Sequence, residues 1–399
     1  VVGDALYIVG GSDDGGPLGS VERASIDADG TLSSFATVAG VALTTARAAH
    51  TSVVAGNSLY IIGGDDGVAM SSVERASLDA GGALSGFGAV SGVTLATPRA
   101  QHATVVAGDS LYLIGGFNGG TLDSVERATI GADGALSSFV TVPGLVLAQA
   151  RYGHSAAVIG STLYVIGGSY GFPVLGSVEQ TTIGADGSLS GFVTVPGVVL
   201  VTPRNGHTSV VVGDALYVLG GSDATGTAID SVERATINAD GSLSTFATVA
   251  GGALASARDG HSSAVIGDSL FVAGGLDTGG NLVTALERAT INTDGSLSSF
   301  ATVASVDLAT PRYLQSSVVA GSSLYIVGGS QGAGEILDSV EQANISTADG
   351  SLSGFTLVPG STLVTSRQNH SNVVLGNMLY VLGGWNGAYV GSVERAILQ

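Results

Sequence analysis

The sequence contains no cysteine and no lysine, and it has one tryptophan and two methionines among its 399 residues. Without cysteine the chain cannot form disulfides, thiolate zinc sites, iron–sulfur clusters or a cysteine nucleophile. No apolar run approaches the roughly 18 residues that a transmembrane helix requires, so we expect no membrane insertion.

Basic residues are also scarce: all 13 are arginine, they face 32 acidic residues, and the formal net charge is −19. An acidic chain without a basic cluster has the wrong electrostatics for nucleic acid or anionic lipid, so we expect neither as a partner. Hydrophobic residues make up 45% of the chain and charged residues 11%, the reverse of a disordered composition. The chain begins within a repeat and has no leader, and we therefore expect a processed or excised piece.

A repeat of 52 to 55 residues runs through the whole chain. The doublet Gly-Gly follows a four-residue apolar run eight times, beginning at Gly10, Gly63, Gly115, Gly167, Gly220, Gly274, Gly328 and Gly383. One unit reads approximately R-x-x-H-S-x-V-V-x-G-D-x-L-Y-x-x-G-G, a variable loop, and then S-V-E-R-A-x-I-x-A-D-G-x-L-S-x-F-x-T-V-x-G-x-x-L. Self-similarity at this period indicates one supersecondary unit per repeat.

Each repeat contains four short segments that are typical of β-strands, such as His50–Val54, Leu59–Ile62, Ser72–Ala76 and Leu84–Val90. Gly-Asp, Gly-Asn or Gly-Ser joins the first segment to the second, and Ala-Asp-Gly joins the third to the fourth, as in hairpins. Four antiparallel strands at this period predict a propeller blade. Stacked blades bury the apolar faces that a lone blade would expose.

The apolar residues before Gly-Gly, the arginine before the first strand and the late aromatic residue resemble kelch repeats. Phe stands in place of the family's late Trp, and Glu-Arg-Ala stands where the family has a Tyr after Gly-Gly. The resemblance implies an all-β, kelch-like β-propeller. We predict one domain over residues 1–399 with eight blades of four antiparallel strands. Seven blades with a redundant hairpin are the alternative, because the Phe strand occurs only seven times.

The motif Arg-x-x-His precedes the first strand of six repeats, and Arg312 with Gln315 replaces it in another. All six histidines occupy this motif: His50, His102, His154, His207, His261 and His370. A ring of imidazoles would suit a metal, but a feature found in nearly every blade indicates a structural anchor, so we predict no metal site and no cofactor. By the same argument, we expect the recurring Glu of Ser-Val-Glu to pair with blade arginines, including across neighbouring blades.

Enzymatic signatures are scarce. The Ala-Asp-Gly turns mostly hold a single Asp, which is too few for a calcium loop, and they lack the Trp of a sialidase Asp-box. The chain has neither a G-x-S-x-G elbow nor a phosphate-binding loop, and copper–radical oxidases with kelch propellers need a cysteine. We therefore predict no catalytic residue. A carbohydrate-active enzyme, such as a sugar epimerase or lyase, or a kelch-type sialic-acid mutarotase, stays open as an alternative.

Residues that depart from the repeat are the candidates for ligand binding. Seven of the eleven Tyr fill the second-strand slot and seven of the ten Phe fill the fourth-strand slot. The residues outside these slots are Phe117, Tyr152, Tyr170, Phe172, Tyr313, Trp385 and Tyr389, with the amides Asn118 and Asn386 in matched contexts. Acidic residues join them at Asp13, Asp14, Asp65, Asp66, Asp223, Asp277 and Glu335.

In an up-down blade, the loop from strand two to three and the loop from strand four to the next blade emerge on one face. We therefore predict that these residues form a ligand-binding face; the alternative is that the aromatic rings pack on their own loops. Aromatic rings beside amides and carboxylates suit glycans or protein hot spots.

We expect a non-enzymatic recognition module that binds a glycan or a protein, located outside the cell or at its surface, with its oligomeric state open. A structural cell-surface or filament subunit is a further alternative. The zero counts of cysteine and lysine and the high Gly, Ser and Thr content are the basis for expecting export.

Overall fold

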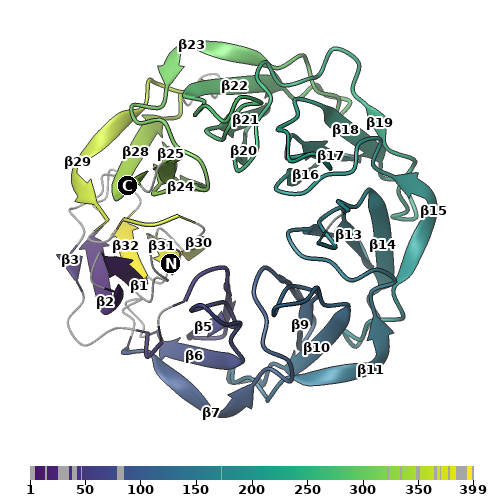
Figure 1. Ribbon diagram of the computed structural model, residues 1–399, viewed down its shortest axis with the longest axis vertical. Coiled ribbons are helices and arrows are strands. Elements are labelled where there is room, and N and C mark those ends of the chain that lie inside the picture. Colours follow the sequence, from purple (N-terminus) through teal and green to yellow (C-terminus); the bar gives the residue numbers. More distant parts are fainter. Residues whose placement is uncertain are drawn as a thin grey trace.

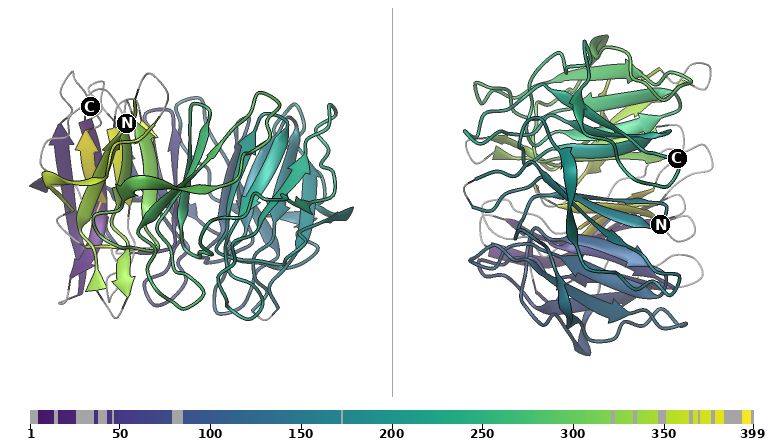
Figure 2. Two further views of the ribbon diagram at one scale, coloured as in Figure 1. Left: turned by 90° about the horizontal axis from the view of Figure 1, so that it is seen from above. Right: turned by 90° about the vertical axis from the view of Figure 1, so that its right-hand side faces the viewer.

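The polypeptide forms a ring of β-sheets around a central axis (Figure 1). The computed structural model describes residues 5–13, 16–25, 36–37, 43–45, 47–78, 85–171, 173–320, 323–332, 335–346, 351–363, 366–368, 370–375, 378–382 and 393–397. The regular elements of these residues are all β-strands, as the sequence predicts. In the side view the loops gather at two opposite faces of a disc (Figure 2).

Six consecutive segments each fold into a four-stranded antiparallel blade. The first strand of each blade lies innermost and the fourth lies at the rim (Figure 1). A short ribbon of β26 (Ser330–Gly332) and β27 (Glu335–Ile336) decorates the sixth blade. The first blade consists of β4 Thr51–Ala55, β5 Ser58–Ile62, β6 Ser72–Ser77 and β7 Gly88–Thr94, and the second of β8 Ala103–Ala107, β9 Ser110–Ile114, β10 Ser124–Thr129 and β11 Val140–Val146. The third consists of β12 Ser155–Ile159, β13 Thr162–Ile166, β14 Ser177–Thr182 and β15 Val193–Val199, and the fourth of β16 Thr208–Val212, β17 Ala215–Leu219, β18 Val232–Thr236 and β19 Ala247–Thr248. The fifth consists of β20 Ser262–Ile266, β21 Ser269–Ala273, β22 Ala285–Thr290 and β23 Ala301–Asp307, and the sixth of β24 Ser316–Ala320, β25 Ser323–Val327, β28 Ser339–Asn344 and β29 Thr356–Thr362.

Strands from the two ends of the chain share one six-stranded sheet, in the order β3-β2-β1-β32-β31-β30. Val9 of β1 is the point of contact, since it pairs with Val393 of β32 and with Leu382 of β31. These strands are β1 Ala5–Asp13, β2 Gly16–Ser25, β3 Ala36–Thr37, β30 Ser371–Leu375, β31 Met378–Leu382 and β32 Val393–Ile397.

The predicted number of eight blades, and the alternative of seven, are therefore wrong: the described residues form six four-stranded blades. Our prediction assumed that every Gly-Gly doublet marks a blade of its own. The hairpins at the two ends of the chain instead join one sheet, and that pairing leaves no signature in the repeat itself.

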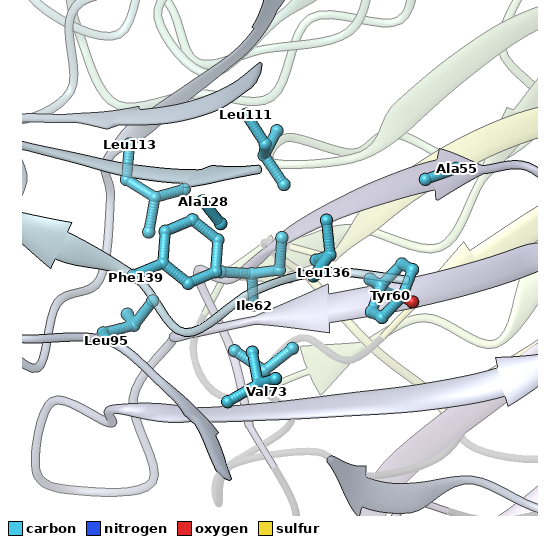
Figure 3. Packing of buried hydrophobic residues seen from close by; sticks show 11 residues of the cluster. Ala55, Tyr60, Ile62, Val73, Leu95, Leu111, Leu113, Ala128, Leu136 and Phe139 are labelled. Atoms are coloured by element: carbon cyan, nitrogen blue, oxygen red, sulfur yellow. The ribbon is translucent and has the colours of Figure 1, made fainter. Parts of the chain in front are cut away.

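Apolar side chains fill the seams between neighbouring blades. Figure 3 shows one seam, in which Tyr60 and Ile62 of the first blade pack with Leu111 and Phe139 of the second. The described copies of the repeated Phe are only 2–8% exposed, and burial of such a ring stabilises the fold by about 1.5–3 kcal/mol. The late aromatic residue of each repeat therefore serves to close a seam.

A buried arginine ties together the strands of each blade. In the second blade, Arg99 Nη1 donates to the carbonyls of Gly115 at 2.7 Å and Ser124 at 3.0 Å, and Nη2 donates to Glu126 at 2.6 Å. The carboxylate of Glu126 also accepts the amides of Ala96 at 2.8 Å and Thr97 at 2.7 Å, which anchors the loop that arrives from the first blade.

The expectation that the repeated Glu pairs with a blade arginine is confirmed, and each pair that the structure describes lies within one blade rather than across two. The other pairs are Arg47–Glu74, Arg151–Glu179, Arg204–Glu233, Arg258–Glu287 and Arg312–Glu341.

The Gly-Gly doublet lets neighbouring blades approach closely. Gly63 has a φ of +60°, and a Cβ there would come within 2.6 Å of the carbonyl oxygen of Arg99. The amide of Gly64 donates to that same carbonyl at 2.9 Å, across the seam between the first and second blades. The motif arginine therefore holds its own blade with its guanidinium and its neighbour with its backbone.

Replacement of Glu126 with Gln should destabilise the fold, because it leaves the Arg99 guanidinium buried without its counter-charge. We expect the free energy of unfolding, measured by urea denaturation, to fall by about 3 kcal/mol. Asp109→Asn is the matched control: Asp109 lies 3.9 Å from Arg127 in an exposed pair, and its loss should cost less than about 0.5 kcal/mol. Equal losses in the two variants would contradict the role of the buried pair.

Candidate functional site: the mouth of the central opening

The imidazoles of the Arg-x-x-His motif bind hydroxyl groups on the preceding blade. His102 Nε2 lies 2.9 Å from Thr51 Oγ1, which links the innermost strands of the first two blades. Gln315 takes the place of the imidazole in the sixth blade and donates to the carbonyl of Ala273 at 2.8 Å. The same hydroxyl–imidazole hydrogen bond, which we call the histidine latch, joins Ser155 to His207 at 3.0 Å, Thr208 to His261 at 3.1 Å and Ser316 to His370 at 2.7 Å.

The seam between the second and third blades has no such hydroxyl. Ala103 occupies the position that Thr51 and Ser155 hold in their blades. As a result, both ring nitrogens of His154 are buried without a hydrogen-bond partner. His154 therefore retains hydrogen-bonding capacity that most of its counterparts use within the fold.

Two residues separate the arginine from the histidine in each motif, and we call them the mouth residues. The first pairs through its backbone with the loop between strands two and three of the same blade, as in Tyr152 with Ser169 and Asp259 with Leu276. This pairing brings the two sets of loops together on one face, as the sequence predicts.

The second mouth residue has a positive φ in each described blade, between 51° and 63°. Glycine fills this position in three blades, but Ala49, Gln101 and Leu314 hold it with a side chain. Their amides and carbonyls bond across the seams, as when Gln101 donates to Ala49 at 2.9 Å and Leu314 donates to Gly260 at 2.8 Å. Side chains held in this region cost about 1–3 kcal/mol each and cluster at ligand sites.

A pocket of about 510 Å³ opens among the mouth residues. Its walls come from several blades, so it lies where the blades converge. The lining includes neutral polar side chains such as Gln101 and Asn205, and Asp259 is the only acidic side chain among the described residues that line it. The lining comprises Ala49, His50, Gln101, His102, Tyr152, Gly153, His154, Asn205, Gly206, Asp259, Leu314 and His370.

The carboxylate of Asp259 lies across the seam against the fourth blade. A Cβ on Gly206 would come within 2.2 Å of Asp259 Oδ1, so a side chain at position 206 would displace the carboxylate. Paired backbone bonds with Leu276, at 3.0 and 2.9 Å, fix the residue. Burial raises the pKa of Asp259, while the Gly260 amide and the Ser222 hydroxyl act in the opposite direction.

A smaller pocket of about 150 Å³ lies between the loops of the third and fourth blades, with Tyr152 and Asn205 in its wall. The polar groups of this pocket bind one another: Asn205 Nδ2 donates to Ser169 Oγ at 2.7 Å, and Ser222 Oγ donates to Asn205 Oδ1 at 2.6 Å. Little spare hydrogen-bonding capacity is left there for a ligand.

The binding residues that the sequence predicts are only partly brought together. Phe117 and Tyr152 contact each other edge to face, with ring centroids 5.5 Å apart, across the seam between the second and third blades. Tyr170 is exposed on the neighbouring loop, and Asn118 is exposed beside Phe117. Tyr313 lies two blades beyond Asn205, next to Gly260. Phe172, Trp385, Asn386 and Tyr389 lie outside the described residues, and the binding role of the whole set stays a prediction.

Three residues of the large pocket were missed by a search for unusual aromatic residues: Gln101, Asn205 and Asp259. For Asn205 and Asp259 a signal was nevertheless present in the sequence. The arginine before the mouth residues never varies and the histidine varies once, whereas the first mouth residue reads Ala48, Ala100, Tyr152, Asn205, Asp259, Tyr313 and Gln368 along the chain.

The histidines of the ring are neutral at physiological pH. Burial, reinforced by the charge of the motif arginines, lowers the pKa of His50, His102, His154, His207 and His261 to about 3. The pKa of His370 is lowered well below its ordinary value for the same reasons.

Among the described residues, no three His, Asp or Glu side chains converge in a way that would hold a metal ion. The described part of the chain also contains no helix with the length and apolarity needed to cross a bilayer.

Comparisons with known proteins agree with this architecture. A family model described as the KLHDC2/KLHL20/DRC7 Kelch-repeats domain matches residues 193–384, and the Kelch motif model matches residues 46–75, 98–127 and 150–180. The solved structure of YjhT superposes with a TM-score of 0.54 at 16% identity, over 79% of this chain and 98% of that one. This likeness concerns the fold alone.

Two curated relatives are similar over part of the chain. Kelch domain-containing protein 3 of Rattus norvegicus is 28% identical over 199 residues, which cover 44% of this chain and 48% of the relative. A probable serine/threonine-protein kinase of Dictyostelium discoideum is 30% identical over 185 residues, which cover 46% of this chain and 14% of the kinase. The matched segment therefore spans about half of the first relative and a small part of the second.

A hydroxyl at position 103 should supply the latch that the second blade lacks. We expect Ala103→Thr to be more stable than the nearly isosteric Ala103→Val by about 1 kcal/mol, because only Thr can bond His154. Thr51 shows that threonine fits at this position of the blade. Thermal and urea unfolding of the two variants measure the difference, and equal stabilities would show that the hydroxyl contact contributes nothing.

Acid should destabilise the fold in the range where free histidine titrates. The pKa of these histidines is about 6.5 in the unfolded chain and about 3 in the fold, so between these values the unfolded state binds more protons. Stability is therefore complete above pH 6.5 and falls as the pH drops, by up to about 1.4 kcal/mol per pH unit for each histidine.

Urea midpoints measured between pH 7.5 and 5 test this dependence. His261→Gln should have a shallower slope, because Gln315 shows that glutamine fits at this position of the motif. A midpoint that does not change with pH over this range, or the same slope in the variant, would contradict the assignment.

Proposed function

Because the chain belongs to the kelch-repeat family of β-propellers, we propose that it is a non-enzymatic recognition module that binds a protein partner at the mouth of its central opening. Kelch propellers are typically protein-interaction modules. The curated relatives are matched over half of their length or less. That this chain has a protein partner is therefore proposed and is not inferred from those relatives.

One observation carries the proposal: the mouth residues vary between blades, while the arginine before them is always the same and the histidine after them varies once. The motif arginine and the repeated Glu are the same in each described blade and are fully buried. The first mouth residue changes from Ala48 to Tyr152, Asn205 and Asp259 in a ring whose backbone geometry stays the same. The backbone does not require Tyr152 or Asp259 at this position, since Ala48 holds the same pairing, and such variation favours contact with something outside the fold.

Protein is favoured over glycan as the ligand. A glycan would need aromatic rings with free polar groups beside them, and the small pocket beside Tyr152 has its amide and hydroxyl groups bound to each other. The large pocket spans several blades and has a varied polar lining, which suits the anchor residue of a protein surface.

The test compares the wild type with a Tyr152→Ala/Tyr313→Ala double variant. Ala48 and Ala100 occupy the same position in other blades, so we expect the variant to fold. Arg127→Gln is the control, because Arg127 lies near the opposite face beside Ser110 and Gln180 holds its place in the third blade.

Each immobilised protein is incubated with extract from the source cells, retained proteins are quantified by mass spectrometry, and candidates are purified and retested. We expect at least one protein to bind the wild type and the control equally and the double variant at least tenfold less. A glycan array run in parallel tests the other ligand class. Glycan binding that the double variant abolishes, or partners that bind the double variant as well as the wild type, would contradict the proposal.

A further inference from the structure

The large pocket contains a carboxylate without a counter-ion. Asp259 lines it, and none of the ion pairs among the described residues includes Asp259. The motif arginine that directly precedes it in the chain, Arg258, is fully buried and bound to Glu287. A partly buried carboxylate that lacks a cation is costly unless a partner completes it.

Among the described side chains, the basic groups that remain accessible lie at the other face. Arg75 donates to Ser58 at 2.8 Å, and Arg127, Arg234 and Arg288 lie within 3.5 to 3.9 Å of aspartates in the turns between strands one and two. These turns are at the opposite end of the blades from the mouth. No described basic group can therefore reach the pocket.

A second unused group in the pocket is the His154 imidazole. Both of its nitrogens lack a partner, because Ala103 replaces the hydroxyl that would bind it. Its pKa of about 3 keeps the ring neutral, so one of its nitrogens is a hydrogen-bond acceptor at physiological pH. Tyr152, which also lines this pocket, carries an aromatic ring of the kind that binds cations.

The loops around the mouth are also acidic. The loops between the second and third strands contain no lysine and no arginine in any repeat. Their acidic residues in the described blades are Asp65, Asp66, Asp123, Asp223, Asp230, Asp277, Glu335 and Asp338. This face therefore attracts cations over the range of the Debye length, about 8–10 Å at physiological salt.

We propose that the mouth pocket binds the cationic side chain, arginine or lysine, of a basic segment on a protein partner, with Asp259 as its counter-ion and His154 and Tyr152 beside it. The cation replaces the missing counter-charge of Asp259, and its N–H groups donate to that carboxylate and to the unpartnered acceptor nitrogen of His154. This inference rests on the proposed function and specifies the chemistry of the partner.

The test uses a fluorescein-labelled fifteen-residue Gly/Ser peptide with four arginines, and matched peptides with lysine, citrulline or glutamate in place of arginine. Binding to the 399-residue chain is measured by fluorescence anisotropy at 0.15 M salt. We expect the arginine or the lysine peptide to bind, and the citrulline and glutamate peptides to bind at least tenfold more weakly.

Asp259→Asn is the decisive variant, and Asn205 shows that asparagine fits at this position of the ring. Asp186→Asn, in an exposed turn on the opposite face, makes the same change in net charge. We expect Asp259→Asn to weaken binding of the basic peptide at least tenfold and Asp186→Asn to leave it within twofold. The thermal midpoint of Asp259→Asn should equal or exceed that of the wild type, because the variant removes a buried charge.

Equal losses in the two variants would assign the binding to the overall negative charge and overturn the inference, as would strong binding of the citrulline peptide or no binding of either basic peptide. If no basic peptide binds while a cellular partner still depends on Tyr152 and Tyr313, the inference fails and the proposed function stands.

Discussion

The buried pair of arginine and glutamate within each blade is the interaction on which the rest of the structure depends. Its guanidinium binds the backbone of two strands, its carboxylate holds the loop from the preceding blade, and its backbone carbonyl accepts the Gly-Gly amide across the seam. Both charges are fully buried, so each is tolerable only while the other is present. This mutual dependence explains why the two residues recur without change where the structure describes them.

Around these pairs, the seams are closed by contacts that can be exchanged one at a time. A histidine latch joins the inner strands, while a tyrosine hydroxyl such as that of Tyr112 reaches the turn of the next blade at 3.0 Å. Gln315 replaces one histidine and Phe271 replaces one tyrosine, and the ring tolerates both. Ala103 is a further exchange of this kind, because it lacks the hydroxyl that other blades offer to the histidine. As a result, the His154 imidazole in the wall of the mouth pocket has no hydrogen-bond partner.

The sequence predicted much of this architecture because the repeat period, the hairpin turns and the Gly-Gly doublet each reflect a local constraint. The number of blades was not predictable in this way, since it depends on long-range pairing of Val9 with Val393 and Leu382. The placement of these loops on one face followed from blade topology. Asp259 and Asn205 were missed because a search for unusual rings ignores polar residues, whose importance appears only when equivalent positions converge on one pocket.

The central claim is that residues repeated in every blade hold the ring together, while residues that differ between blades at the mouth are free to serve binding. A saturation substitution scan that measures the protease-resistant folded fraction of each variant tests it most directly. The account predicts that almost every substitution at Arg99, Arg204, Glu126 or Glu233 makes the chain more sensitive to protease, and that most substitutions at Tyr152, Asn205, Asp259 and Tyr313 leave the folded fraction unchanged. Comparable intolerance at the two sets of positions would contradict it.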